Sequence, residues 1–311
     1  MFNFLRHIKN HFHRKQAALH WNQHESKIKR VDWWESAGIL RHYNQRICGQ
    51  PLEGVADGAQ QALLDAFPGH IFERAVSVGC GTASKEMQLL ERKLVSRFDL
   101  FEISSKRITA GQADAERRNL SAQLNFYERD AFKAKVKDNT YDLVYWDNSL
   151  HHMFDVEDAI KWSRRVLKPG GVLLMNDFVG PSRFQWTDEM LEAGRKVREM
   201  LPKEKLRNPF VPETFFPVTP EKYTVEAMIE TDPSEAADSE RIIENIRKFF
   251  PEAKIIPTGG VIYSLALGGV IHNLDEEKDA DLIQKCLQID DECIDNGMTH
   301  YAFAIAQKMG S

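Results

Sequence analysis

The 311-residue sequence lacks any pair of cysteines at a spacing typical of metal ligands. Its four cysteines are scattered along the chain, and no two form a C-x-x-C pair; they are Cys48, Cys80, Cys286 and Cys293. This pattern indicates neither a zinc site nor a disulfide framework. Reduced thiols in a cytoplasmic protein fit it best.

Long apolar runs are also lacking. No stretch approaches the roughly 18–20 apolar residues that a membrane span requires, and the first residues have neither the apolar core nor the cleavage site of a secretory signal. The net charge of -5 disfavours a general nucleic-acid binder. With 42% hydrophobic and 28% charged residues, the composition is that of a soluble globular protein.

The charge is unevenly distributed. Residues 1–30 contain seven Lys and Arg and one acid, a net charge of +6. The rest of the chain therefore carries a net charge of -11, which gives the total of -5. Residues 1–15 place Met1, Leu5, Ile8 and Phe12 at helical spacing among basic residues, which predicts a basic amphipathic helix. Such a helix can make peripheral contact with the anionic inner face of a membrane, or it can pack on the body of the protein. The sequence leaves both interpretations open and does not indicate an oligomeric state.

Strand-like and helix-like segments alternate from residue 56 onward. Apolar runs predict strands at 74–80, 97–104, 124–131, 141–152, 172–179, 253–260 and 300–308. Helical patterns occupy 60–67, 84–95, 105–119, 156–167, 239–250 and 279–297, and "KPGG" at 168–171 reads as a turn. Strands separated by helices predict an α/β fold with a mostly parallel sheet covered on both faces.

The alternation breaks between residues 181 and 237, where prolines and aromatic residues are frequent. A segment of this length between sheet elements is usually functional, for example a lid. We therefore predict an N-terminal helical extension at 1–55, a core at 56–180, a lid that binds the acceptor at 181–237, and the rest of the core at 238–311.

The stretch "SVGCGTASKE" at 77–86 lacks a third glycine. Gly79, Cys80 and Gly81 lie between a predicted strand and a predicted helix, the context of a nucleotide-binding loop. A dinucleotide loop would have a glycine at Ser84, and a methyl-donor loop would have one at Ala83. Taken alone, the stretch fits either cofactor, or simply a tight turn.

Two acids follow at the ends of the next strands. Glu102 lies 21 residues past Gly81, where a carboxylate can accept hydrogen bonds from both ribose hydroxyls of an adenosine. Asp130 follows the third strand and can accept a hydrogen bond from an adenine amino group, with Phe132 flanking the ring. A dinucleotide cofactor, which is bound through its pyrophosphate, would not require a carboxylate at Asp130.

Five segments in this order resemble the class I S-adenosylmethionine-dependent methyltransferases: "VSVGCGTAS", "FDLFEIS", "ERDAF", "YDLVYWDNSLHHM" and "VLKPGGVLLMNDF". The resemblance implies a Rossmann-like, doubly wound sheet of seven strands, S-adenosylmethionine as methyl donor and S-adenosylhomocysteine as product. It further implies that the donor is bound by Gly79, Cys80, Gly81, Glu102, Ile103, Asp130, Ala131, Phe132, Asp147, Asn148 and, on an N-terminal helix, Tyr43. The chain departs from the family at Ser77, where an acid is usual, and at Ala83.

Two further segments, "DFVGPSRFQWTDEML" and "TDPSEAADS", are similar to a bacterial subgroup often associated with polysaccharide and small-molecule gene clusters. This similarity favours a small-molecule or glycan acceptor. Arg183, Trp186 and Tyr223 are candidate contacts to that acceptor, although packing within the lid would explain them equally well.

The loop "DNSLHHM" offers a general base. A hydroxyl acceptor must lose its proton during attack, and histidine titrates in the right range. Because adjacent residues tend to point in opposite directions, we expect one of His151 and His152 to face the pocket. His152 is slightly favoured, because the family has a histidine at the corresponding position; capping of the next helix is the other interpretation.

Asp177 ends the fifth strand and can orient the base or bind the acceptor. Together with His151, His152 and Asp147 it could ligate a hard metal. Nothing in the spacing demands an ion, and we predict none.

The leading hypothesis is O-methylation of a small-molecule or glycan hydroxyl. N-methylation of a small amine is the close alternative. A NAD-dependent oxidoreductase is disfavoured by Ser84 and Asp130, and a non-catalytic donor-binding domain by the retained acids and histidines.

Overall fold

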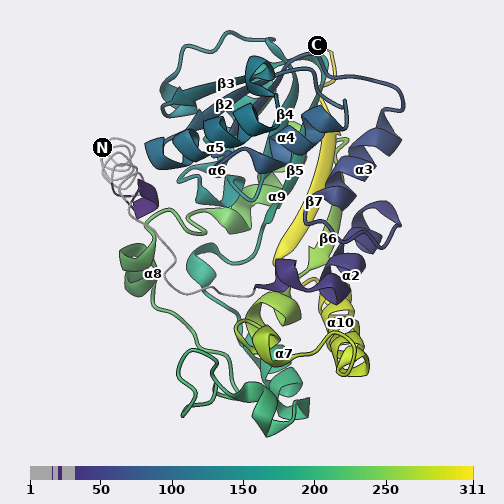
Figure 1. The fold of residues 1–311 in the computed structure, drawn as a ribbon, viewed down its shortest axis with the longest axis vertical. Coiled ribbons are helices and arrows are strands. Elements are labelled where there is room, and N and C mark those ends of the chain that lie inside the picture. Colours follow the sequence, from purple (N-terminus) through teal and green to yellow (C-terminus); the bar gives the residue numbers. More distant parts are fainter. Residues whose placement is uncertain (1–15, 17–19, 23–31, 311) are drawn as a thin grey trace.

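Seven strands form one sheet in the computed structural model, which describes residues 16, 20–22 and 32–310 (Figure 1). The strand order is β3-β2-β1-β4-β5-β7-β6, and only β7 runs antiparallel to its neighbours. The bounds are β1 Ala75–Val78, β2 Phe98–Glu102, β3 Leu124–Glu128, β4 Tyr141–Asp147, β5 Leu167–Phe178, β6 Lys254–Gly259 and β7 Tyr301–Gln307. The predicted doubly wound, mostly parallel sheet is confirmed.

Helices cover both faces of the sheet, as a parallel sheet requires. They are α2 Ala37–Cys48, α3 Asp57–Ala66, α4 Ser84–Glu91, α5 Ser105–Arg117, α6 Val156–Val166, α7 Asp188–Met200, α8 Val225–Thr231, α9 Ile242–Phe249 and α10 Ala280–Asp295. One buried apolar cluster joins the sheet to α2, α3, α4 and α10, and a second joins it to α6 and α9. Strand β1 is buried along its whole length, which fixes the loop after it at the centre of the sheet.

The "KPGG" segment is not a turn before a strand, as the sequence predicts, but part of β5. Tyr141 pairs with Leu167, and the next pair joins Leu143 to Val172, so residues 168–171 form an irregularity within the strand. Gly170 adopts a left-handed conformation with φ 79° and donates its N–H to the Lys308 carbonyl. The strand therefore starts five residues earlier than expected.

The segment after β5 contains helices that the sequence pattern does not reveal. Helix α7 begins after Thr187, whose side chain accepts a hydrogen bond from the Met190 amide, and it packs on a π-helical turn at Val261–Ala266. Buried Arg198 of α7 donates to the Leu265 and Ala266 carbonyls and so joins the two segments. In Figure 1 these elements and α10 form the lower part of the molecule, below the sheet.

No helix in the described part of the chain is both long and apolar enough to cross a bilayer. The basic segment 1–15 lies outside the described residues. The division at residues 55, 180 and 237 stays a prediction.

Candidate functional site

The glycine loop is closely packed against the loop that follows β4. Gly79 and Gly81 have φ values of 69° and 59°, in the left-handed region that favours glycine. A Cβ atom on Gly79 would lie 3.2 Å from the Cβ of Ser149. The backbone therefore favours glycine at both positions, and Gly79 is exposed.

Ala83 also adopts a glycine-like conformation. It has φ 59° and ψ 27°, it is fully buried, and it immediately precedes α4. A left-handed conformation costs a residue with a Cβ about 1–2 kcal/mol. The loop thus keeps the shape expected for a third glycine although the residue is Ala83.

Glu102 ties the end of β2 to the glycine loop. Its Oε2 accepts the Gly81 amide at 2.9 Å, and its Oε1 accepts the amides of Ile103 and Ser104 at 2.7 and 2.9 Å. The side chain is 4% exposed. Glu102, which the sequence predicts to bind the ribose, thus lies at the carboxyl edge of the sheet, and three backbone donors fix its orientation.

Asp130 lies at the same edge, one strand further out. Its carboxylate accepts the Phe132 amide at 2.9 Å, and Lys133 Nζ lies 4.0 Å away. Ala131 is buried, and the Phe132 ring meets Trp162 edge-on at 5.6 Å between centroids. The predicted adenine contacts therefore form one short turn after β3.

Asp147 is the centre of a polar network at the end of β4. It forms an ion pair with Lys85, and it accepts hydrogen bonds from Tyr145 at 2.8 Å and from Asn176 at 3.4 Å. Tyr43 of α2 donates to the Asn176 side chain, so the N-terminal helix reaches the edge of the sheet. Burial and the charge of Asp147 raise the pKa of Tyr43 well above its usual value. Next along the chain, Asn148 is exposed and left-handed, with φ 52°.

His151 and Asp177 form a buried pair. His151 Nδ1 lies 2.5 Å from Asp177 Oδ1, and both side chains are almost fully buried. Asp177 also accepts the backbone amides of Ser149, Leu150 and Phe178. Burial lowers the pKa of His151, but the charge and hydrogen bond of Asp177 more than offset this, so the pKa lies above the usual histidine value.

His152 has different surroundings. Its Nδ1 lies 3.2 Å from the Ser234 hydroxyl, and its ring meets Trp21 edge-on at 5.3 Å. Desolvation, aided by the positive charge of His151, lowers the pKa of His152 well below the usual value. Neighbouring histidines thus have pKa values shifted in opposite directions.

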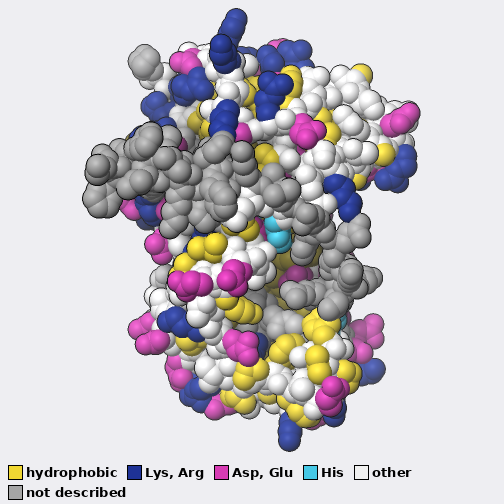
Figure 2. Space-filling view, turned by 90° about the vertical axis from the view of Figure 1, so that its left-hand side faces the viewer, with side chains coloured by type: hydrophobic (Ala, Val, Ile, Leu, Met, Phe, Trp, Pro, Cys, Tyr) yellow, Lys and Arg dark blue, Asp and Glu magenta, His cyan; other side chains and the backbone are white. Residues whose placement is uncertain are grey.

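The two histidines do not point in opposite directions, contrary to the expectation from the sequence. Their ring centroids are 4.0 Å apart, because Leu150–His152 is a 3-10 turn rather than extended chain. Figure 2 shows a histidine side chain at the bottom of a hollow between the upper and lower parts of the molecule.

Glu235 approaches the histidines from the end of the predicted lid. Its Oε1 lies 3.6 Å from His151 Nε2, too far for a hydrogen bond. His151, His152 and Glu235 place possible ligand atoms within 4.8 Å of one another, and they are the only such trio in the described part of the chain. This arrangement of two imidazoles and a carboxylate is the only candidate metal site among the described residues, and the prediction that the protein binds no metal stays untested.

The three predicted acceptor contacts fall in different surroundings. Arg183 is half-buried and left-handed, with φ 56°, and its Nη1 donates to the Glu235 carbonyl at 2.9 Å. Trp186 is buried and stacked on His300, with centroids 4.5 Å apart. Tyr223 is 47% exposed. The structure brings only Arg183 close to the histidine pair.

Sequence reasoning missed four residues of the site. Lys85 and Glu86 follow the glycine loop on α4. The family usually has an acid at the position of Ser77, so the nearby acid Glu86 could have been recognised from the sequence as a candidate site residue. Glu235 lies in "TDPSEAADS", which gave no hint of its position. Trp21 had no signal; it packs between His152 and the Arg107 guanidinium, which lies 3.9 Å from the Trp21 ring centroid.

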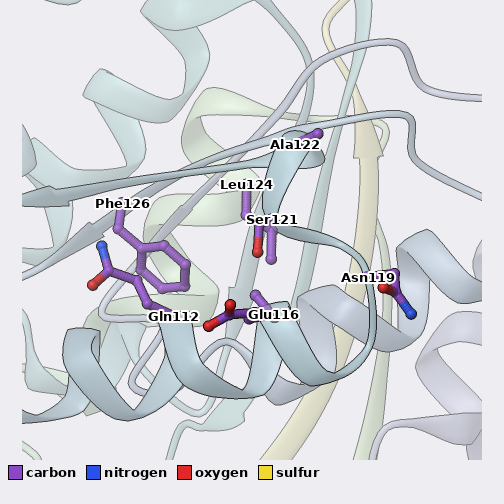
Figure 3. Close-up of a pocket in the computed structure, with 8 residues that line it drawn as sticks. Gln112, Glu116, Asn119, Ser121, Ala122, Leu124 and Phe126 are labelled. Atoms are coloured by element: carbon purple, nitrogen blue, oxygen red, sulfur yellow. The ribbon is translucent and has the colours of Figure 1, made fainter.

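A separate open pocket of about 650 Å³ lies between α5 and β3 (Figure 3). It is lined by Gln112, Ala115, Glu116, Asn119, Ser121, Ala122, Leu124 and Phe126. Glu116 is its only titratable residue, and the pocket lies by the start of β3, whereas the acids described above follow the strand ends. It therefore takes no part in the chemistry of the carboxyl edge.

Comparison with known proteins agrees with this geometry. Residues 76–175 match the family described as "Methyltransferase domain". The chain is 26% identical over 119 residues to a ubiquinone/menaquinone biosynthesis C-methyltransferase of Dinoroseobacter shibae, covering 38% of this chain and 48% of the relative. It is 27% identical over 128 residues to the 27-O-demethylrifamycin SV methyltransferase of Amycolatopsis mediterranei, covering 41% and 47%.

The chain thus spans about half the length of these curated relatives. Among solved structures, geranyl diphosphate C-methyltransferase from Streptomyces coelicolor A3(2), in complex with Mg²⁺, geranyl diphosphate and S-adenosyl-L-homocysteine, has the same fold. The TM-score is 0.56 at 12% identity, over 96% of this chain and 98% of that one. Residues 76–175 therefore belong to the methyltransferase-domain family, in a chain that has the class I S-adenosylmethionine-dependent methyltransferase fold.

Proposed function

We propose that the protein is an S-adenosylmethionine-dependent methyltransferase that methylates a hydroxyl group of a small molecule or glycan. The observation that carries the choice of a hydroxyl is the buried His151–Asp177 pair, with 2.5 Å between Nδ1 and Oδ1. An amine can react unprotonated and needs no base, whereas a hydroxyl must lose a proton.

The carboxyl edge suits the methyl donor. S-Adenosylmethionine, when bound, supplies a methyl group on a sulfonium, together with ribose hydroxyls, an adenine and an amino-acid group. Gly79 and Gly81 allow a ligand to approach the backbone closely, and Glu102 and Asp130 offer carboxylates at neighbouring strand ends. We assign the donor to Gly79, Cys80, Gly81, Glu102, Ile103, Asp130, Ala131, Phe132, Asp147, Asn148 and Tyr43.

The proton of the acceptor goes to His151 in this proposal. Asp177 accepts a hydrogen bond from Nδ1–H, which leaves the lone pair on Nε2 to receive the proton. Asp177 is then the positioning residue, as in other carboxylate–imidazole pairs. The sequence slightly favoured His152, but its lowered pKa makes it the weaker base, and it serves here as a contact to Ser234 and Trp21.

The acceptor lies between the histidine pair and the lid. Arg183 supports this assignment because both it and Phe184 adopt left-handed conformations, and such strain is concentrated at functional sites. We retain Trp186 as a wall of the pocket and Tyr223 at its outer rim. The name of the rifamycin relative makes an O-linked acceptor chemically familiar in this family, while names of other relatives include C- and N-methyltransferases. A cytoplasmic enzyme that contacts the inner membrane face through residues 1–15 is compatible with this function.

The first test is titration calorimetry with S-adenosylhomocysteine and with NAD. We expect micromolar-scale binding of the first and none of the second; the reverse would exclude the proposal. A screen of hydroxyl and amine acceptors with mass detection of the added methyl group then decides the acceptor.

The base is tested with His151→Ala and His152→Ala. We expect the first to lower kcat by about 100-fold or more with unchanged donor affinity, and the second to lower it far less. Equal kcat for His151→Ala and the wild type would reject His151 as base, and the reverse order would return the role to His152.

A further inference from the structure

Glu86 is a buried carboxylate in the first turn of α4, next to the glycine loop. It is 3% exposed, and its Oε1 accepts a hydrogen bond from Ser77 Oγ at 2.6 Å. Ser77 lies on β1, directly before the loop. The Ser77 hydroxyl therefore holds an acid at the end of the central strand, although the acid itself belongs to the helix.

Three other carboxylates at this edge accept more hydrogen bonds than Glu86 does. Glu102 accepts three backbone amides. Asp177 accepts three amides and binds His151. Asp147 is paired with Lys85 and accepts two further hydrogen bonds.

Glu86 has the most capacity left. Ser77 is its only side-chain hydrogen-bond partner among the described residues, and no cationic nitrogen there lies within 4.0 Å of its oxygens. The charged and titratable groups that face it are Lys85 on its own helix, Cys80 in the loop, and Tyr145 and Asp147 on β4. With Lys85 neutralising Asp147, Glu86 is left as the uncompensated negative charge of this group.

We propose that the Glu86 carboxylate binds the α-ammonium group of the methyl donor and of its demethylated product. The proposal rests on the proposed function and adds a residue to it. An ammonium group carries three N–H donors and a positive charge, and hydrogen bonds between charged partners are roughly twice as strong as neutral ones. Lys85 is not the cation that pairs with Glu86, because its ammonium group is already paired with Asp147.

The electrostatics of the site agree with this assignment. Burial raises the pKa of Glu86 to about 7, against the lowering effect of its hydrogen bonds from Ser77 and its own amide. Such a carboxylate has lost hydration without gaining a cation, so a bound ammonium restores the missing partner. Ser77 is then a positioning residue that orients the acid.

The experiment compares two ligands on three proteins by calorimetry at pH 8. The ligands are S-adenosylhomocysteine and its deaminated analogue, in which hydrogen replaces the α-amino group. The proteins are the wild type, Glu86→Gln, and the matched control Glu91→Gln, which alters an exposed acid on the same helix.

We expect the wild type and the control to bind S-adenosylhomocysteine about 10- to 100-fold more tightly than the analogue, the range for a charged hydrogen bond. In Glu86→Gln this advantage should disappear, while affinity for the analogue stays within about twofold of the wild type.

A Glu86→Gln protein that keeps the advantage, or that loses affinity for both ligands equally, overturns the assignment. A wild type that binds neither ligand refutes the proposed function instead. If Glu86→Gln does not fold, Ser77→Ala is measured in its place: a loss of about threefold or more for S-adenosylhomocysteine alone supports the role of Glu86, and an equal loss for both ligands overturns it.

Discussion

We assign the methyl donor to the ends of β1 to β4 (the donor edge) and the acceptor to the space between the histidine pair and the lid (the acceptor side), and these two regions are built in different ways. At the donor edge, acids such as Glu102 and Asp130 hydrogen-bond to backbone amides one or two residues away, at the ends of adjacent parallel strands. On the acceptor side, His151 lies near Glu235, which comes from a segment far along the chain, and Trp186 stacks on His300, directly before the last strand. The donor edge follows from the topology of the sheet, whereas the acceptor side depends on how distant segments pack.

His151 and His152 lie between the two regions, and they differ in the same way: one has a partner within the sheet, and the other has partners from distant segments. The first is held by Asp177 of β5, within the sheet, and its pKa is raised. The second contacts Ser234 and Trp21, and its pKa is lowered. Adjacent residues of one type thus differ in chemistry because their partners come from different parts of the fold.

Asp177→Asn should have the largest effect, because Asp177 joins the two regions. We expect kcat to fall by about 100-fold or more, as the imidazole loses its charged partner. The pKa of His151 should drop, so that the acidic limb of the pH–rate profile moves to lower pH. Affinity for S-adenosylhomocysteine should be preserved; unchanged kcat together with an unchanged profile would separate Asp177 from the chemistry.

Glu86→Gln tests whether the buried, ionised Glu86 lowers the free energy of unfolding. The folded-state pKa of Glu86, about 7, lies above the ordinary value of 4.5. Stability associated with the neutral acid is therefore complete below pH 4.5 and is lost as pH rises through 7. Glutamine does not ionise, so the variant should be more stable than the wild type by about 3 kcal/mol at pH 8 and about equal to it at pH 4.5.

Denaturant unfolding at the two pH values measures this difference, with Glu91→Gln as the control on the same helix. A stability difference between Glu86→Gln and the wild type that does not depend on pH would show that ionisation of Glu86 is not the cause.

Asp130→Ala should act on the donor edge alone. Loss of one hydrogen-bonded contact predicts about a tenfold weaker affinity for S-adenosylhomocysteine. The melting temperature and the ranking of acceptors should remain as in the wild type. If donor affinity stayed the same and acceptor preference changed, the assignment of Asp130 to the donor region would be wrong.

Removal of metal ions should have the smallest effect. Under the proposed mechanism His151 Nε2 accepts a proton and cannot at the same time ligate a metal. Dialysis against a chelator should leave kcat unchanged, and added Mn²⁺ or Zn²⁺ should not raise it. A loss of activity that a divalent ion restores would identify His151, His152 and Glu235 as a metal centre.

The contrast between the two regions also explains what the sequence could predict. The sequence could place Glu102 and Asp130 at one edge of the sheet because the ends of parallel strands converge there, so that spacing along the chain predicts position in space. Glu86 was missed because whether its side chain faces the loop depends on the rotation of α4. Glu235 was missed because nothing local to it indicates that His151 lies nearby.

The orientation expected for His151 and His152 differs from the observed one for a local reason. The expectation that only one ring faces the site assumed extended chain, and the 3-10 turn at Leu150–His152 brings both rings together. Helix α7 lies between prolines and is rich in charged residues, which conceals its pattern in the sequence. The sequence predicts a turn at residues 168–171 because composition does not reveal the hydrogen bonds that Gly170 and Gly171 make to Lys308.

Ala83 has a consequence for how this chain can be altered in the laboratory. Replacement of alanine by glycine usually weakens a protein, because the unfolded chain gains freedom. Here the alanine already occupies backbone angles that glycine adopts without penalty. Ala83→Gly is therefore a rare case in which removing a buried methyl group relieves backbone strain. The variant offers directed evolution a starting protein in which the glycine loop is free of this strain.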